Sequence, residues 1–366
     1  DKTIGHIAWT LIEIGPAVVK PLIKALHSAN AYLRSAAVVA LGEMHCSIAL
    51  NPIIERLKDK NRKVRLNAII ALGKLRDSRA VEPLLCSLKE NDSTLRQEAV
   101  ETLGKIKDKK AVAPLIQMLK DRDSKVKWWA AWALAEIQDK RAIAPLIELL
   151  KDKNIDTGSC CIGIGGPSHA LGKFKDRRAV TELIIALKHP NREVRSRAAW
   201  ALGEIKDRCA VKPLISILNN DNTDINQFYV GEALGKIRDK SAFRHLIKAT
   251  KSKNHQLRKG AANALGKFKD KRAVKPLLIL LKDKDYYVRS PAAEALGRIK
   301  DIRAIKPLLE LARNGGYGDK PSAIESLGCF GRLAVRPLTD LLKNKPDLHI
   351  HICDVLAKIG KPAIKP

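Results

Sequence analysis

The chain has 366 residues, with 68 Lys and Arg against 39 Asp and Glu, and a formal net charge of +29. Its hydrophobic content of 45% excludes a disordered polybasic tail, and it has no run of about 18 apolar residues to span a bilayer. The seven cysteines are odd in number and thinly spread, which disfavours a secreted disulfide framework and favours a reducing, cytoplasmic location. An aromatic content of only 4% points to a core of many small layers.

One segment recurs along most of the chain. It is first complete as ALGKLRDSRAVEPLLCSL at 71–88 and returns as TLGKIKDKKAVAPLIQML at 102–119 and ALGKFKDKRAVKPLLILL at 264–281. Most successive copies of its landmark lie 31 residues apart: Gly42, Gly73, Gly104, Ala135, Gly172, Gly203, Gly235, Gly266, Gly297 and Gly328. Self-similarity at this period predicts a solenoid in which each unit buries its apolar face against its neighbours.

Each copy is predicted to form two helices. The first helix has the pattern AVxPLLxLL, with proline in the first turn, where its missing N–H is not needed. A polar turn follows, and the second helix has the pattern seen in VRSPAAEALGRI at 288–299. Residues 1–15 supply only a second helix, and residues 361–366 would begin another first helix. We therefore expect one solenoid of about eleven repeats over 1–366, with partial terminal repeats whose apolar faces are covered by another domain or a second copy.

Two charged positions recur in register with the landmark, which is numbered position 0. Aspartate occupies +4, in the turn after the second helix, and arginine occupies −8, at the edge of the apolar face. We expect these two positions to form a ladder of Asp–Arg hydrogen bonds between neighbouring repeats. The aspartates are Asp77, Asp108, Asp139, Asp176, Asp207, Asp239, Asp270 and Asp301, and the arginines are Arg34, Arg65, Arg96, Arg195, Arg258 and Arg289.

The pattern resembles HEAT repeats, most closely the short HEAT-like repeats of phycobilisome lyases, and the resemblance covers essentially the whole chain. It implies an all-α fold, a right-handed α-α superhelix of the armadillo-like type, with the second helices lining its concave surface. It does not specify a function, because scaffolds, lyases and nucleic-acid binders all use this repeat.

The largest break in the pattern is a Gly-rich insertion loop at 153–167, before the landmark Gly172. Its glycines should interrupt the start of that second helix. The loop is either a binding loop whose backbone N–H groups meet an anion or a partner, or simply a mobile surface loop. Its candidate residues are Gly158, Cys160, Cys161, Gly163, Gly165 and Gly166.

Aromatic residues concentrate in the central repeats, where position −3 is predicted to point away from the apolar face. We expect a patch that binds a partner on the concave surface, since exposed aromatics are typical of interfaces. Alternatively, the tryptophans lie flat over alanine-rich neighbours and fill the groove. The predicted patch comprises Trp128, Trp132, Glu136, His169, Trp200, Glu204, Phe228 and Tyr229.

Basic residues recur at +1 and +3, which predicts a ridge along one edge of the solenoid. Such a ridge could follow a phosphate backbone. Alternatively, the cations stabilise helix C-termini and aid solubility. The ridge comprises Lys74, Arg76, Lys105, Lys107, Lys173, Lys175, Lys206, Lys236, Arg238, Lys267, Lys269, Arg298 and Lys300.

Catalytic and metal-binding signals are weak. His349, His351 and Cys353 lie two residues apart, on different faces of a helix, and no complete catalytic motif is present. We expect no metal, no cofactor and no membrane, and a non-enzymatic scaffold that binds a protein partner on its concave face. The alternatives are nucleic-acid binding along the ridge, and a lyase or chaperone for a bilin, which the resemblance allows.

Overall fold

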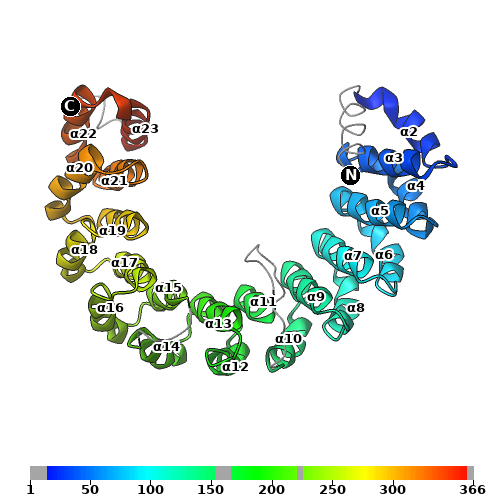
Figure 1. Cartoon of the computed structure of the whole chain (residues 1–366), viewed down its shortest axis with the longest axis horizontal. Coiled ribbons are helices and arrows are strands. Elements are labelled where there is room, and N and C mark those ends of the chain that lie inside the picture. The colour runs from blue at the N-terminus through cyan, green and yellow to red at the C-terminus, as the bar shows by residue number, and fades with distance from the viewer. Residues whose placement is uncertain (1–14, 153–165, 221–225, 361–366) are drawn as a thin grey trace. The chain divides into compact units, whose positions relative to one another are not determined.

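The computed structural model describes residues 15–152, 166–220 and 226–360. Within these ranges the chain forms α-helices joined by short 3₁₀ helices and turns, with no β-strand (Figure 1). None of the helices in these ranges is both long and apolar enough to cross a membrane. The all-α prediction is confirmed, and the described residues contain the expected eleven helix pairs.

The chain divides into two compact units: unit 1 is residues 1–179 and unit 2 is residues 180–366. Continuity of a single solenoid over 1–366 stays a prediction. In unit 1 the first helices are α2 (Val19–Ala25), α4 (Leu50–Glu55), α6 (Val81–Ser87), α8 (Val112–Met118) and α10 (Ile143–Leu150). The second helices are α3 (Ala31–Glu43), α5 (Arg62–Leu75), α7 (Ser93–Ile106), α9 (Ser124–Ile137) and α11 (Gly166–Phe174).

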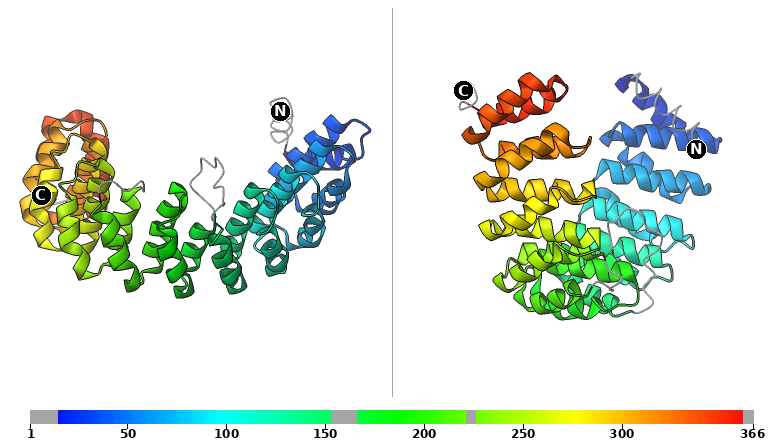
Figure 2. Two further views of the ribbon diagram at one scale, coloured as in Figure 1. Left: turned by 60° about the horizontal axis from the view of Figure 1, so that its bottom comes forward. Right: turned by 60° about the vertical axis from the view of Figure 1, so that its left-hand side comes forward.

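Unit 2 contains six helix pairs. Its first helices are α12 (Val180–Ala186), α14 (Val211–Leu218), α16 (Phe243–Ala249), α18 (Val274–Leu280), α20 (Ile305–Asn314) and α22 (Arg332–Asn344). Its second helices are α13 (Arg192–Ile205), α15 (Gln227–Ile237), α17 (His255–Phe268), α19 (Tyr286–Ile299), α21 (Asp319–Gly328) and α23 (His349–Ile359). In both units the pairs stack one after another in two layers (Figure 2).

Side-chain caps define where the second helices begin. Asp92 accepts hydrogen bonds from the backbone N–H groups of Thr94 and Leu95 at the start of α7, and Asn61 caps α5 in the same way. These caps satisfy N–H groups that have no partner inside the helix. The apolar faces behind them consist of alanine, leucine and valine, nearly all fully buried.

The landmark glycines let consecutive second helices approach closely. A Cβ at Gly42 would lie 2.7 Å from the Cβ of Ala71, and one at Gly235 would lie 2.6 Å from the Cα of Ala264. Consecutive second helices accordingly pack closely in each unit, whereas the first helices splay apart, leaving grooves such as the one of about 630 Å³ between α8 and α10. This unequal spacing places the second helices on the concave side of each unit.

The predicted arginine ladder exists, but its partners differ from those predicted. Arg96 of α7 binds Asp121, in the turn before α9, with Nε–Oδ2 and Nη2–Oδ1 distances of 2.8 and 2.9 Å. The same bidentate bond joins Arg34 to Asp59 and Arg258 to Asp283, each 25 residues ahead.

The aspartates at +4 have a local role instead. Asp77, Asp139, Asp176, Asp270 and Asp301 each cap the following 3₁₀ turn and bind the arginine two residues ahead, as in the Asp301–Arg303 pair at 2.8 Å. The expected pairing of −8 with +4 is therefore wrong. The short 3₁₀ turn places the +4 aspartate beside the arginine two residues ahead of it. The −8 arginine instead binds an aspartate in the turn before the next second helix.

Candidate interaction surfaces

In unit 1 the predicted patch is more deeply packed than expected. Trp132 is half-buried on α9, and its ring lies directly against Gly104 of the preceding repeat, where a Cβ would come within 2.7 Å of the ring. This is the packing of a tryptophan over a small neighbour, the alternative that the sequence left open. Trp129 meets Trp132 edge to face, with ring centroids 5.4 Å apart.

Trp128 is buried, with 9% of its surface exposed, so its place in the exposed patch is corrected. Its ring lies against Gly166, which begins α11 with a φ of +77° and where a Cβ would come within 2.8 Å of the ring. A residue without a side chain is needed at that point. The half-buried neighbour Trp129, which the sequence reading missed, takes the place of Trp128 beside Trp132.

Glu136 forms two ion pairs within unit 1. Its carboxylate accepts a hydrogen bond from Lys107 at 2.7 Å and another from Lys173, so it joins α7, α9 and α11. Burial alone would raise the pKa of Glu136, but the two lysines lower it overall. His169 is half-buried on α11. Glu136 therefore supports the packing of repeats more than it presents a binding surface.

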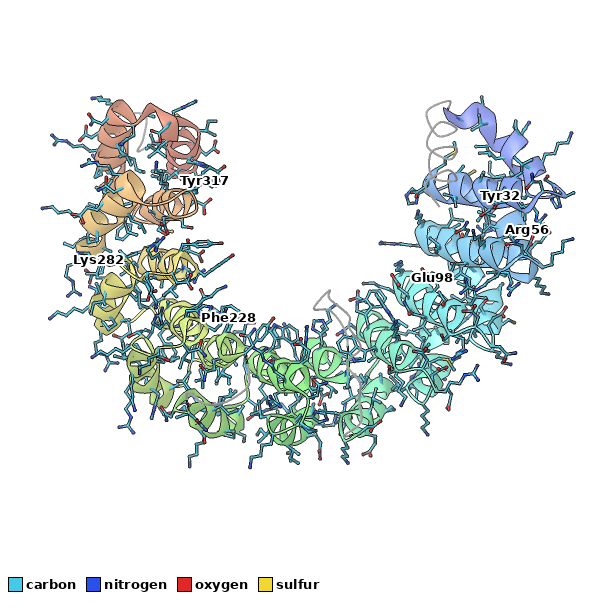
Figure 3. The ribbon with its side chains drawn as sticks, in the orientation of Figure 1. Tyr32, Arg56, Glu98, Phe228, Lys282 and Tyr317 are labelled. Atoms are coloured by element: carbon cyan, nitrogen blue, oxygen red, sulfur yellow. The ribbon has the colours of Figure 1, made fainter. Side chains whose placement is uncertain are left out.

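The second-helix layer of unit 1 also holds an acidic residue that the sequence reading missed. Glu98 lies on the inner side of α7 (Figure 3). Burial raises the pKa of Glu98, and repulsion by Glu101 raises it further. No periodic signal marks this position, because other repeats hold neutral or basic residues there.

In unit 2 the predicted residues lie in the same layer. Lys236 of α15 lies over the Trp200 ring, 5.7 Å from its centroid, and binds Glu204 at 2.6 Å and Glu232 at 2.8 Å. Burial alone would lower the pKa of Lys236, but the hydrogen bonds to both carboxylates raise it overall. Trp200 and Glu204 are thus both half-buried against α15.

Further along unit 2, aromatic side chains gather at the N-terminal turns of the second helices. The Nζ of Lys259 lies 4.8 Å from the ring centroid of Phe228 and 5.6 Å from that of Tyr287. Tyr286 and Tyr287 have ring centroids 3.9 Å apart, and a Cβ at Gly318 would lie 3.5 Å from the Tyr286 ring. We call the set the aromatic row: Phe228, Tyr229, Lys259, Tyr286, Tyr287 and Tyr317.

The aromatic row is accessible. Tyr286, Tyr287 and Tyr317 are 44%, 52% and 99% exposed. Phe228 and Tyr317 lie on the second-helix side of unit 2, opposite Lys282 (Figure 3). Of this row the sequence reading identified only Phe228 and Tyr229. The sequence signal for Tyr286 and Tyr287 is their position directly after the capping residue Asp285.

The predicted basic ridge separates into two sets. All six cations at +1 form ion pairs with glutamates of the second-helix layer, as Lys74 does with Glu43 and Arg298 with Glu294: the six are Lys74, Lys105, Lys173, Lys236, Lys267 and Arg298. Their charge is therefore largely neutralised.

The cations at +3 are exposed and lie just beyond the helix, in the left-handed backbone region. This set is the basic edge: Arg76, Lys107, Lys175, Lys206, Arg238, Lys269 and Lys300. The left-handed conformation costs a residue with a Cβ roughly 1–2 kcal/mol, whereas a cation at a helix C-terminus gains about 0.3–1 kcal/mol. Glycine would suit this position better than any of these residues.

The remaining candidate residues contribute no site. Gly158, Cys160, Cys161, Gly163 and Gly165 of the insertion loop lie outside the described residues. No group of three or more His, Cys, Asp or Glu in the described part of the chain is placed to hold a metal ion, and this applies to His349, His351 and Cys353.

Comparison with known families identifies the repeat. A family model of HEAT repeats matches residues 19–103, 83–157, 168–235, 211–283 and 243–328, well over half of the chain. The chain therefore belongs to the HEAT-repeat family, and the resemblance seen in the sequence is confirmed. No curated protein sequence matches it.

Solved structures agree on the fold. Yeast importin-β, Kap95p, in its complex with RanGDP is 13% identical, with 96% of this chain and 55% of that chain covered and a TM-score of 0.65. In the Kap95:Nup1 complex the identity is 13%, the coverage is 96% and 58%, and the TM-score is 0.66. This chain thus spans little more than half the length of those proteins, and the likeness shows the solenoid fold alone.

A phycocyanin lyase is also similar. The complex of CpcE and CpcF from Nostoc sp. is 24% identical, with 59% of this chain and 86% of that chain covered, at a TM-score of 0.43. A likeness at this level carries no argument about a bilin, so lyase or chaperone activity stays a prediction from the sequence.

Proposed function

We propose that this HEAT-repeat protein is a non-enzymatic scaffold that binds a protein partner on its second-helix layer, with the aromatic row of unit 2 at the centre of the interface. One observation carries the proposal. In a chain with only 4% aromatic residues, three exposed tyrosines gather beside Phe228 and Tyr229 on one side of one unit. Tyrosine is enriched in protein interfaces and at their energetic hot spots.

The geometry of the row supports this use. Lys259 is held between Phe228 and Tyr287, and the two tyrosines of α19 pack on each other, so the side chains are ordered before a partner arrives. A tyrosine has only two side-chain torsions and therefore loses little entropy when it is buried by a partner. A large aromatic surface that is exposed and already ordered favours tight association.

The fold supports a protein partner. The similar importin-β structures include complexes with RanGDP and Nup1, which shows that solenoids of this kind present surfaces to other proteins. That likeness does not identify the partner of this chain. The partner's chemistry follows from the row itself: it would offer apolar or aromatic side chains for the tyrosines and a carboxylate for Lys259.

The test is affinity capture from a nuclease-treated extract of the source cells, followed by identification of the retained polypeptides. The double variant Tyr286→Ala/Tyr287→Ala should lose the partner, because removing a hot spot costs about 2 kcal/mol or more, roughly a 30-fold loss of affinity. The matched control is Ile185→Ala/Ile279→Ala, which removes two exposed apolar residues from the first-helix layer of unit 2.

The half-buried tryptophans are less suitable for this test. Replacing Trp132 or Trp200 removes packing against Gly104 or Lys236 and so changes stability together with binding. If the tyrosine variant and the isoleucine control retain the same polypeptide equally well, the aromatic row is not the interface and the proposal fails.

A further inference from the structure

The basic edge of unit 2 has a regular construction that neither the fold nor the proposed protein interface explains. Its members Lys206, Arg238, Lys269 and Lys300 follow the last residues of α13, α15, α17 and α19, with φ values of 60°, 58°, 54° and 58°. All four are exposed, and none of them has an ion-pair partner among the described residues. Because these helices lie side by side, their ends form a row with a spacing of roughly 8–10 Å.

The identity of these residues is unexpected on stability grounds alone. A left-handed position at a helix end favours glycine or asparagine, because a Cβ is strained there. A cation nevertheless occupies it in four consecutive repeats of unit 2. Gln138 holds the equivalent position in unit 1, with a φ of 60°, so the backbone does not require a charge. Strain that recurs with one kind of side chain points to a role for that side chain.

Aspartates of the same edge are neutralised by neighbouring arginines. Asp270 and Asp301 bind the arginines of their own 3₁₀ turns, at 2.7 and 2.8 Å, and those bonds are the largest cause of the lowered pKa of each carboxyl. Lys240 and Lys271, one residue beyond the aspartates, are exposed. The exposed surface of this edge therefore carries a net positive charge, although an aspartate directly follows each of its four cations in the sequence.

We propose that this edge of unit 2 binds the phosphate backbone of a double-stranded nucleic acid. A linear row of exposed cations on a rigid scaffold matches a linear array of phosphates, and this binding needs no sequence recognition. A protein partner would require an apolar centre, but the exposed large apolar residues at or next to this edge, among the described residues of unit 2, are only Ile302 and, one repeat further on, Leu333. A single strand would require aromatic platforms, and those lie elsewhere.

The two proposed surfaces of unit 2 can be tested independently. The aromatic row lies at the N-terminal turns of the second helices and the basic edge at their C-terminal ends. A 14-residue helix such as α17 or α19 is about 20 Å long. Substitutions at one end of these helices therefore leave the other end intact. The nucleic-acid proposal can fail while the protein-partner proposal holds, and the reverse.

The experiment measures the fluorescence anisotropy of a labelled duplex of about 30 base pairs, titrated with the whole chain between about 50 and 200 mM KCl. The edge variant is Arg238→Gln/Lys269→Gln/Lys300→Gln. Glutamine is chosen because Gln138 already occupies the equivalent left-handed position in unit 1. The control is Lys212→Ala/Lys275→Ala/Lys306→Ala, which removes the same charge from exposed positions on the first helices.

The wild-type chain and the control should bind the duplex with a steep salt dependence. In the edge variant the slope of log K against log salt should become shallower by about three, one phosphate contact for each cation removed. Thermal melting should be nearly the same for all three proteins, because the edge cations are not needed for folding.

Three results would overturn the proposal. The first is that the wild-type chain does not bind the duplex at the lowest salt concentration. The second is an equal loss in the edge variant and the control, which would assign binding to net charge alone. The third is displacement of the duplex by poly-L-glutamate or by a single strand at equal charge concentration, which would assign the edge to an acidic protein or to unpaired nucleic acid.

Discussion

Replacing Arg96 with alanine should destabilise the junction between α7 and α9 far more than a surface ion pair would. The Arg96 guanidinium makes a bidentate bond to Asp121 and also donates to the backbone oxygens of Glu90 and Asn91, at 2.9 and 3.0 Å. The two charged side chains are only 5% and 7% exposed. Removing the arginine leaves the buried Asp121 carboxylate and the Glu90 carbonyl without this partner, whereas the Asn91 carbonyl keeps a hydrogen bond from Arg122 at 2.8 Å.

The expected cost follows from this burial. Breaking one side of a buried ion pair costs about 3–5 kcal/mol, chiefly because the remaining charge stays in a poorly solvated place. The matched control is Arg79→Ala, because Arg79 makes a similar bidentate bond to Asp77 but the two side chains are 63% and 26% exposed. A surface pair of this kind contributes about 0–1 kcal/mol.

The assay is native-state hydrogen exchange of the amides of α7 and α9, because a repeat protein opens locally and need not unfold in one step. Arg96→Ala should raise the opening constant by about two to four powers of ten, and Arg79→Ala by less than one. The double variant Arg96→Met/Asp121→Leu should recover much of the loss, since apolar residues can replace a buried ion pair. Equal effects of the two single variants would refute the assignment of Arg96 to a structural ladder.

Two further predictions concern pH and helix spacing. The hydrogen bond from Arg34 lowers the pKa of Asp59 from its usual 3.8. The ionised carboxylate therefore stabilises the folded state fully above about pH 3.8, and this stabilisation is lost as the pH falls through the lower pKa of the folded state. Thermal melting between about pH 5 and pH 2 should show this decline, and Asp59→Asn should reduce its slope; an unchanged slope would refute the linkage. Gly235→Ala should destabilise unit 2 by about 1–3 kcal/mol, because the new Cβ would lie 2.6 Å from the Cα of Ala264, partly offset by about 1 kcal/mol of helix propensity. In urea denaturation, Ala135→Gly should lose about 1 kcal/mol of helix propensity and about 0.8 kcal/mol more for its buried methyl group, because Ala135 is 1% exposed. A Gly235→Ala protein as stable as the wild type would contradict the close-approach explanation.

Much of the fold could be read from the sequence because its determinants are local. The 31-residue repeat, the proline in nine of the eleven first helices and the capping Asp or Asn before most second helices are all signals that act within one repeat. Stacking these repeats leaves little freedom in the core, so the helix pairs agree with the prediction. The landmark glycine was visible as a marker, although its role in bringing helices together appears only when the neighbouring Ala264 or Ala71 is placed opposite it.

The candidate site was less predictable, because residues one or two positions apart in the sequence have different burial and different partners in the structure. Trp128 and Trp129 differ by one step on the helical wheel, and the position of Gly166 decides which of them is buried. Lys236 at +1 is still helical and reaches carboxylates of the inner layer, whereas Arg238 at +3 has left the helix and faces solvent. A pattern that treats +1 and +3 as one ridge cannot separate them.

The sequence by itself determined that this protein is a stack of helix pairs, because periodicity, capping and proline placement act within a single repeat. Only the tertiary structure decided which partner each charge takes. For Arg34, Arg96 and Arg258 at −8, the offset between adjacent second helices selects an aspartate 25 residues ahead. Arg289, at the same position, instead binds Asp319, 30 residues ahead. That offset depends on how closely backbones can approach at the glycines, which is a property of two repeats in contact and not of one repeat's sequence.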